Sequence, residues 1–471
     1  MSESSFDAAR FYAPDDAAAD AVADGGAEAA DAELSKKDEH DSIEYVLRMA
    51  RDRKVKFVRL WFTDILGILK SVAIIADELE TALEEGITFD GAAIEGFSRE
   101  TESDMIALPD PETFVLLPFQ DDEGAVARLF CDIVRPDGSP AQTDPRYVLK
   151  SQLQEAAKLG FTFYVGPEVE YFYFKQMPDN APRKPEPLDH GGYFDLTPHD
   201  LASPLRRKTA LTLEKMDIGV ESSHHEGAPS QHEIDLRYTD ALTMADSLMT
   251  FRLVVKEIAA ENGVFATFMP KPSERYNGSG MHINMSLFKG GKNAFFDAKK
   301  PDEMSKTAQY FLAGLLKHSA ELTLFTNQWI NSYKRLVPGF EAPTRATWAM
   351  RNRDDLVRVP SFKPGRESSR RVEYRSPDAA CNPYLVFALL LAAGLDGINN
   401  KLPLDEESNS NAMVLPASLN EAITAAKDSE LARRVLGVLL FDKFLDNKRA
   451  EWENYRGQVH QYELDRYLSI L

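Results

Sequence analysis

The feature that most constrains this fold is a strongly apolar run, residues 161–174 (FTFYVGPEVEYFYF), which holds two glutamates. Its aromatic and β-branched residues predict a strand. Because alternate side chains of a strand share a face, Glu168 and Glu170 point the same way. Both faces are otherwise apolar, so two like charges would be buried, which is costly unless a cation lies between them. For this segment alone, a strand end that reaches solvent is the simpler alternative.

Three later segments carry polar side chains that suit the same cavity. Residues 223–236 form a loop with glycine and proline that enters a strand, whereas residues 280–287 and 371–375 alternate between polar and apolar. The polar positions are Glu226 and Glu233, then His282, Asn284 and Ser286, then Arg371, Glu373 and Arg375. Each face alone is typical of a half-exposed strand. Together with the first run they predict a shared polar cavity inside a curved sheet.

The side chains of this cavity predict what it binds. Five carboxylates and one imidazole suit hard divalent cations, Mg²⁺ or Mn²⁺, better than zinc. They are too many for one ion, so we expect two or three. Arginines beside such ions indicate phosphate, and metal with arginine is what phosphoryl transfer needs. No Walker A lysine loop or GxGxxG fingerprint supplies a rival nucleotide site.

A loop near the cavity is a candidate lid. Residues 331–343 carry Arg335 and Glu341 around a Pro-Gly pair and lead to Arg353 and Arg358. The alternative is a salt-bridged surface loop.

The length of 471 residues is too great for one ordinary core and predicts at least two domains. Residues 1–40 are rich in Ala, Asp, Glu and Gly, and we expect a disordered acidic tail. Residues 41–143 read as a small α+β domain. The larger domain, 144–471, opens with a helix after Asp144-Pro145, and strands and long helices then alternate.

Charge and cysteine content exclude several classes of protein. The net charge of −21 argues against nucleic acid or anionic membranes as partners. The longest uncharged apolar run, 384–395, is shorter than the ~20 residues of a spanning helix. No secretory signal opens the chain. Cys131 and Cys381 are the only cysteines, which predicts a reducing cytoplasm and excludes a thiolate metal site.

The motifs resemble those of type I glutamine synthetase over residues 42–471. The similarity looks greatest to the actinobacterial glutamine-synthetase-like subgroup, some of whose members ligate glutamate to polyamines. The matching strings, in order, are FDGAAIEGF, ESDM, GPEVE, GYF, HHEGAPSQHEI, MPKP, NGSGMHIN, NSYKRLVPGFEAP, NRDDLVRVP and RRVEYRSPD. The resemblance implies an α+β fold, with a β-grasp-like N-terminal domain and a catalytic domain whose curved antiparallel sheet forms the cavity.

The resemblance also implies a role for each matching residue. The metal ligands are Glu170, Glu226 and Glu233 for one ion and Glu168, His282 and Glu373 for the other. Glutamate and ammonium bind at Asn277, Gly278, Arg335, Arg375 and Tyr193. ATP binds at Glu221, Asn284, Ser286, Arg353, Arg358 and Arg371. The catalytic residues are Asp90, Glu341 and Arg353.

The implied reaction has two steps. ATP phosphorylates the γ-carboxylate of glutamate, and ammonia, released from ammonium by Asp90, displaces the phosphate. Arg353 stabilises the transferring phosphoryl group, and Glu341 closes the site as a flap and takes a proton. Asp90 belongs to a neighbouring subunit in the family, whose assembly is a dodecamer of two hexameric rings.

Three departures from the family pattern leave alternatives open. Ala92 and Ala93 replace two serines near the ammonium site, Asp354 replaces a serine, and 397–415 lacks the tyrosine loop that one branch adenylylates. One alternative is a γ-glutamylpolyamine synthetase on the same scaffold, and a remote one is a non-catalytic regulatory paralogue. Because both Asp90 and Glu341 are retained, the charge of the ammonium pocket is intact. This favours ammonia over a polyamine as the nucleophile.

Overall fold

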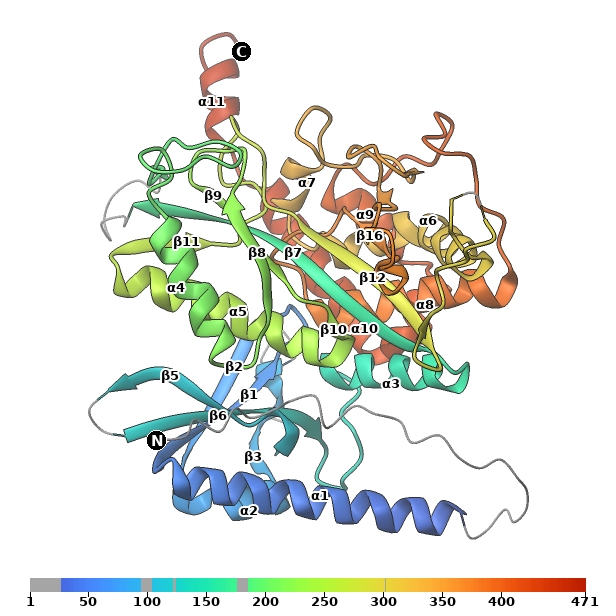
Figure 1. Cartoon of the computed structure of the whole chain (residues 1–471). Coiled ribbons are helices and arrows are strands. Elements are labelled where there is room, and N and C mark those ends of the chain that lie inside the picture. The colour runs from blue at the N-terminus through green and yellow to red at the C-terminus, as the bar shows by residue number, and fades with distance from the viewer. Residues whose placement is uncertain (1–26, 95–103, 122–123, 176–184, 301) are drawn as a thin grey trace.

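The computed structural model describes residues 27–94, 104–121, 124–175, 185–300 and 302–471. Two sheets lie one above the other in Figure 1, the smaller from the N-terminal part and the larger from the rest of the chain. This arrangement of sheets and helices confirms the expected α+β class.

The smaller sheet has six strands in the order β2-β1-β6-β4-β3, with β5 paired to β6. Strands β1 and β6 run parallel, and the other pairs are antiparallel. Among the described residues of this domain, two helices and three single 3-10 turns accompany the sheet, and α1 and α2 lie along its lower side in Figure 1. The bounds are α1 Ala27–Asp52, β1 Val55–Thr63, β2 Leu69–Ile75, η2 Ala76–Glu78, α2 Leu79–Glu85, β3 Ile87–Asp90, η3 Gly91–Ile94, β4 Asp104–Pro109, η4 Pro111–Thr113, β5 Val115–Asp121 and β6 Gly124–Val134.

The first helix corrects the expected extent of the tail. Helix α1 begins at Ala27, so residues 27–40, expected to be disordered, are helical. Alanine and glutamate are among the strongest helix formers, and they outweigh the acidic and glycine-rich composition of the whole segment. The remainder of the expected tail, residues 1–26, lies outside the described residues.

The hairpin of β1 and β2 at the start of the small domain docks onto the large one. The Asp64 carboxylate accepts from the backbone N–H groups of Leu66 and Ile68 at 3.0 and 2.9 Å. Gly67 has φ +79°, and a Cβ there would lie 2.8 Å from the Cα of Asn382. The position therefore requires glycine for both conformation and space. Gln328 completes the junction by donating to the Leu66 carbonyl at 2.7 Å.

The larger sheet has ten strands in the order β14-β15-β16-β12-β7-β9-β8, with β10 and β11 on β7 and β13 on β12. It curves through the upper half of Figure 1, with long β7 and β12 side by side. All its pairs except β14–β15 are antiparallel, which confirms the predicted curved antiparallel sheet. The bounds are β7 Thr162–Lys175, β8 Val220–His225, β9 Gln231–Leu236, β10 Thr239–Asp240, β11 Val264–Thr267, β12 Met281–Lys289, β13 Lys292–Asn293, β14 Trp348–Ala349, β15 Val357–Arg358 and β16 Val372–Tyr374.

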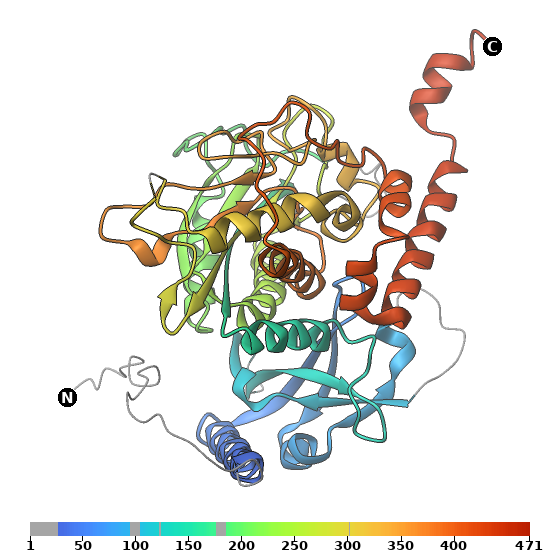
Figure 2. The ribbon, with the colours of Figure 1, turned by 90° about the vertical axis from the view of Figure 1, so that its right-hand side faces the viewer.

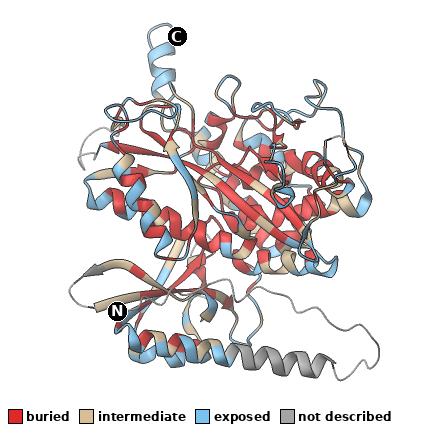
Figure 3. Cartoon of the chain, in the orientation of Figure 1, coloured by how far each residue is buried: buried red, intermediate tan, exposed pale blue. Residues whose placement is uncertain are grey.

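Helices cover the outer side of this sheet. Within the described residues, α8 is long and apolar enough to span a membrane, but 78% of that stretch is buried. It is a core helix. The long strands β7 and β12 run through the red, buried centre of Figure 3. Figure 2 shows α10 at the edge of the molecule and α11 standing away from the body. The bounds are α3 Pro145–Lys158, α4 Ser203–Glu214, α5 Ala241–Glu261, α6 Lys306–Thr326, α7 Ser332–Arg335, η5 Glu367–Ser369, α8 Pro383–Asn400, α9 Leu419–Ala426, α10 Glu430–Arg456 and α11 Gln461–Tyr467.

A buried charge cluster joins the two domains. The Arg146 guanidinium, at the start of α3, pairs with Asp110 and Asp132 of the small domain at 2.8 and 2.6 Å. It also pairs with Asp246 of α5 at 3.1 Å. The same Asp246 accepts from the Tyr384 hydroxyl at 2.5 Å. One arginine thus shares its charge among three carboxylates from both domains.

Candidate active site

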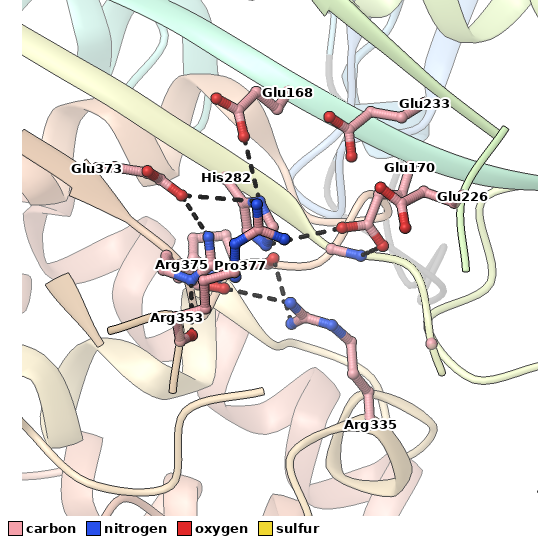
Figure 4. Close-up of polar contacts among 12 residues, drawn as sticks. Glu168, Glu170, Glu226, Glu233, His282, Arg335, Arg353, Glu373, Arg375 and Pro377 are labelled. Atoms are coloured by element: carbon pink, nitrogen blue, oxygen red, sulfur yellow. Dashed lines mark hydrogen bonds and ion pairs between the residues drawn. The ribbon is translucent and has the colours of Figure 1, made fainter. Parts of the chain in front are cut away.

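One cavity in the curved sheet collects most of the residues predicted to bind metal and substrate (Figure 4). It offers about 580 Å³ of empty space, part of which is open solvent at its mouth. Its lining includes Glu168, Glu170, Glu226, Glu233 and His282, and also Tyr193, Asn277, Gly278, Arg335, Glu341, Arg353, Arg358 and Arg375. The sixth predicted metal ligand, Glu373, is fully buried beside this lining.

Strand pairing explains why these side chains meet. His282 of β12 lies opposite Glu168 of β7, and Glu233 of β9 lies opposite Glu170. Residues directly opposite in an antiparallel pair have neighbouring side chains on the same face. The acids and the histidine therefore line one side of three adjacent strands, as their alternation predicts.

The first group of candidate ligands surrounds His282. Its Nδ1 lies 3.4 Å from Glu168 Oε2 and 3.9 Å from Glu373 Oε1. Burial alone would raise the pKa of Glu168, but the hydrogen bonds and charge of His282, with help from Asn284, lower that pKa to about 2. One ligand atom from each of Glu168, His282 and Glu373 lies within 4.8 Å of the others.

The second group holds carboxylates with few cationic partners. Burial raises the pKa of Glu170, although its Oε2 accepts from Gln231 and from the Gly280 N–H, both at 2.9 Å. Burial raises the pKa of Glu233 more strongly, and the nearby charges of Glu170 and Asp235 add to the effect. Within the described chain, the basic side chain at ion-pair distance from Glu233 is the imidazole of His224, at 4.0 Å.

This donor set fits divalent cations. Buried carboxylates that face one another and raise one another's pKa values carry the electrostatic cost that a metal ion would relieve. All the donors are oxygens apart from one imidazole nitrogen, the set preferred by Mg²⁺ and Mn²⁺. The residues present therefore fit the ions implied by the sequence.

The arginines form the opposite wall. Glu373 accepts from Arg358 Nε at 2.5 Å and from Arg375 Nη1, so it is paired on both oxygens. Arg335 is buried and donates to the backbone carbonyls of Ser376 and Pro377 at 2.7 and 3.3 Å. These contacts fix the guanidinium planes beside the acids, where bound anions would meet them.

A second cavity, with about 1270 Å³ of empty space, adjoins the first. Four of the predicted ATP residues line it, namely Glu221, Asn284, Ser286 and Arg371. The Arg371 Nε donates to Asn284 Oδ1 at 2.7 Å, and Asn284 Nδ2 donates to Glu168 at 2.9 Å. Glu168 lines both cavities. The other two predicted ATP residues, Arg353 and Arg358, line the first cavity.

The predicted catalytic residues divide between the domains. Glu341 and Arg353 line the first cavity, and the Arg353 guanidinium lies 6.0 Å from the centre of the Tyr193 ring. Asp90 ends β3 of the small domain, accepts from the Ala92 N–H at 3.0 Å, and lines neither cavity of its own chain.

Several residues around the cavities were not predicted from the sequence, and three of them contact or neighbour the predicted acids and the flap glutamate. Gln231 orients Glu170, Asp235 faces Glu233 and lines the second cavity, and Phe340 lines the first. Strand alternation could have found two of them, because Gln231, Glu233 and Asp235 are spaced by two along β9. Phe340 carries no such signal, since it lies in a loop.

A polar cavity that fits divalent cations, is walled by arginines and shares Glu168 with a second cavity defines a metal-dependent enzyme of phosphoryl transfer. Comparison with known proteins shows which family within this class the chain resembles. The glutamine synthetase catalytic domain matches residues 142–467, and the glutamine synthetase β-grasp domain matches residues 54–136.

Individual relatives agree with the domain matches. Glutamine synthetase of Mycolicibacterium smegmatis is 54% identical, covering 91% of this chain and 99% of the relative. That of Methanosarcina mazei is 49% identical, covering 91% and 98%. A cryo-EM structure of Plasmodium falciparum glutamine synthetase superposes with a TM-score of 0.84 at 27% identity, covering 91% and 98%.

The chain belongs to the type I glutamine synthetase family. It is an enzyme, a glutamate–ammonia ligase that binds ATP and metal. Neither polyamine ligation nor a non-catalytic regulatory role is needed to account for it.

Proposed function

We propose that the chain makes glutamine in two steps within the first cavity, through γ-glutamyl phosphate. The observation that carries this proposal is that Glu168 belongs to both cavities, so the transferred phosphoryl group of ATP in one can reach a carboxylate in the other. The nucleotide would lie against Glu221, Asn284, Ser286 and Arg371. The γ-carboxylate of glutamate would enter from the arginine side.

We propose two or three Mg²⁺ or Mn²⁺ ions per site. Glu170, Glu226 and Glu233 would hold one, and Glu168, His282 and Glu373 another. When bound, the ions neutralise charge on the phosphoryl oxygens of ATP. The mutual repulsion of the buried acids and the raised pKa of Glu233 support this assignment.

The remaining residues of the cavity take the roles of binding and proton transfer. Arg335, Arg375, Asn277 and Gly278 hold glutamate, which suits the fixed guanidinium groups and the backbone approach at Gly278. Arg353, together with Arg358, meets the transferring phosphoryl group, where charge develops. Glu341 covers the site and accepts a proton from the incoming nitrogen, and Tyr193 lies at the ammonium position.

The site is completed by a second subunit in this proposal. Asp90 lines neither cavity of its own chain, so a neighbour's small domain would present it to bind ammonium and release ammonia. Helix α11 and the residues after it support assembly, because this projecting segment exposes Leu464, Tyr467, Leu468 and Ile470. The assembly we propose is a dodecamer of two hexameric rings, working in the cytoplasm, where Cys131 and Cys381 stay free.

A single assay tests the proposal. The full chain, supplied with glutamate, ATP, Mg²⁺ and ammonium, should form glutamine, ADP and phosphate in equal amounts. The same assay with putrescine and spermine in place of ammonium is the comparison. Higher kcat/KM with a polyamine, or no glutamine at all, would overturn the assignment.

A further inference from the structure

One loop on the lining of the first cavity is held in a strained form. This flap, residues 338–343, places Phe340 and Glu341 on the cavity lining. Gly339 has φ +87° and Glu341 has φ +53°. A glutamate in the left-handed region costs free energy, so surrounding contacts must hold it there.

One buried lysine makes such a contact. Lys271 is 7% exposed, and its Nζ lies 3.5 Å from the centre of the Phe340 ring. The same ammonium group donates to the Tyr276 carbonyl. Within the described residues it has no carboxylate at ion-pair distance, and burial, with the charge of Arg335, lowers its pKa to about 8. A ring face is the compensation available to a cation in this position.

The backbone of Lys271 is fixed independently of its side chain. Its N–H donates to Asn331 Oδ1 at 2.7 Å, and Asn331 Nδ2 donates back to its carbonyl at 3.0 Å. Prolines precede and follow it, which further restricts the chain. The ammonium group therefore starts from a rigid support.

The lysine also begins the loop that brings two substrate positions to the cavity. Ser279 N–H donates to the Pro270 carbonyl at 2.8 Å, which closes the loop 270–279. A Cβ on Gly278 would lie 2.2 Å from that carbonyl, so the closure requires glycine. Lys271 thus links the loop that carries Asn277 and Gly278 to the flap that carries Glu341.

We propose that Lys271 is a positioning residue that holds the flap over the cavity by resting its ammonium group on the Phe340 ring. This inference rests on the proposed function, in which the flap shields γ-glutamyl phosphate from water. Water that enters adds to the acyl carbon, the bond from that carbon to the phosphate oxygen breaks, and a proton is released. The products are glutamate and phosphate, so ATP is consumed without glutamine.

The test compares ADP release with glutamine formation in the full-length protein. In Lys271→Met, ADP release without ammonium, relative to glutamine formation with it, should rise roughly three- to thirtyfold, the range of a cation–π contact. The KM for ammonium should rise while the Kd for ATP stays unchanged. Lys271→Arg, which keeps a cation on the ring, should restore most of the parent ratio.

Phe340→Leu provides the second arm, since it keeps apolar bulk but removes the ring face. It should reproduce Lys271→Met, and the double variant should be no worse than either single one. Lys289→Met is the matched control: Lys289 also donates to a backbone carbonyl, of Leu159 at 3.1 Å, and lies 5.2 Å from the Phe161 ring, but away from the cavities. It should behave as the parent.

Hydrogen exchange of residues 338–343 gives a readout that does not need activity. Faster exchange in Lys271→Met and Phe340→Leu, with Lys289→Met unchanged, supports the proposal that Lys271 holds the flap through the Phe340 ring. Unaltered exchange and an unaltered ADP-to-glutamine ratio in Phe340→Leu overturn it, even if Lys271→Met fails to fold. If the parent fails to make glutamine, the proposed function is overturned instead. Hydrogen exchange then still shows whether the contact between Lys271 and Phe340 holds the flap.

Discussion

Glu233 is 6% exposed, and its carboxylate faces those of Glu170 and Asp235. This arrangement would stabilise a bound cation, but it lowers the stability of the metal-free protein. Glu233→Gln should raise the stability of the metal-free protein by about 1 kcal/mol, because a neutral amide removes the repulsion. The same change should weaken Mg²⁺ binding at least about tenfold. Thermal melts over a Mg²⁺ titration measure both effects.

The exposed Glu78 supplies the control for this prediction. Glu78→Gln should leave both the metal-free melt and the Mg²⁺ response as they are in the parent. A Glu233→Gln protein that Mg²⁺ stabilises as strongly as the parent would remove Glu233 from the ligand set.

At the scale of elements, His318 ties α6 to α8. Its Nε2 lies 2.9 Å from Asp396, and its Nδ1 contacts Glu321. Burial would lower the pKa of His318, but these two carboxylates raise it overall. A raised folded-state pKa means that the stabilisation is complete below the unfolded value near 6.5 and is lost as pH rises through the folded value.

His318→Gln should therefore destabilise the protein by about 1–2 kcal/mol at pH 6 and by progressively less toward pH 9. Thermal melts of parent and variant across this range test the trend. His40→Gln is the control, because His40 is exposed and its Glu44 partner lies 3.6 Å away on the same helix. A gap between parent and His318→Gln that does not change with pH would show that the histidine acts by packing alone.

The contacts of the first helix predict that the residues before 41 are not needed for catalysis. Its described contacts with the small-domain core begin at Ile43 and include Val46 and Ala50. Deletion of residues 1–40 should leave kcat within about twofold, a barrier change under roughly 0.5 kcal/mol. Steady-state assays and size-exclusion chromatography check it, and loss of assembly would show that residues before 41 are structural.

The elements were more predictable than their pairing. Alternation along single strands predicts that Glu168 and Glu170 share a face and that His282 and Asn284 do, because a period of two is local. Nothing local predicts that His282 lies opposite Glu168, since β7 and β12 are separated by more than a hundred residues. Strand alternation predicts a shared polar cavity, whereas the division of its acids between two ions came from the family resemblance. The early start of α1 was not predicted, because the acidic and glycine-rich composition of residues 1–40 masks the helix propensity of their alanines and glutamates.

At the scale of the whole molecule, the proposed division of catalytic residues between domains of neighbouring subunits predicts complementation. Asp90→Ala alone should lower turnover about 10²–10⁴-fold, and Arg353→Ala should be similarly impaired. Subunits of the two variants, unfolded and reassembled at equal ratio, should regain about one quarter of the parent sites, because a site needs one intact residue from each neighbour. Glutamine formation by the mixture measures this, and a mixture no more active than its components would place Asp90 outside the neighbour's site.

The cluster around Arg146 has a consequence for modular exchange. Its three aspartate partners come from both domains, and Trp61 and Phe130 of the small domain pack in the same core as the large one. A cut between residues 136 and 142 would take two of its three carboxylate partners away from the Arg146 guanidinium. It would also remove Trp61 and Phe130 from the core that they share with the large domain. Chimeras that graft the small domain of a relative onto this chain should therefore succeed only when the aspartates and rings travel with it. The two domains should therefore evolve together, although only a short segment of chain connects them.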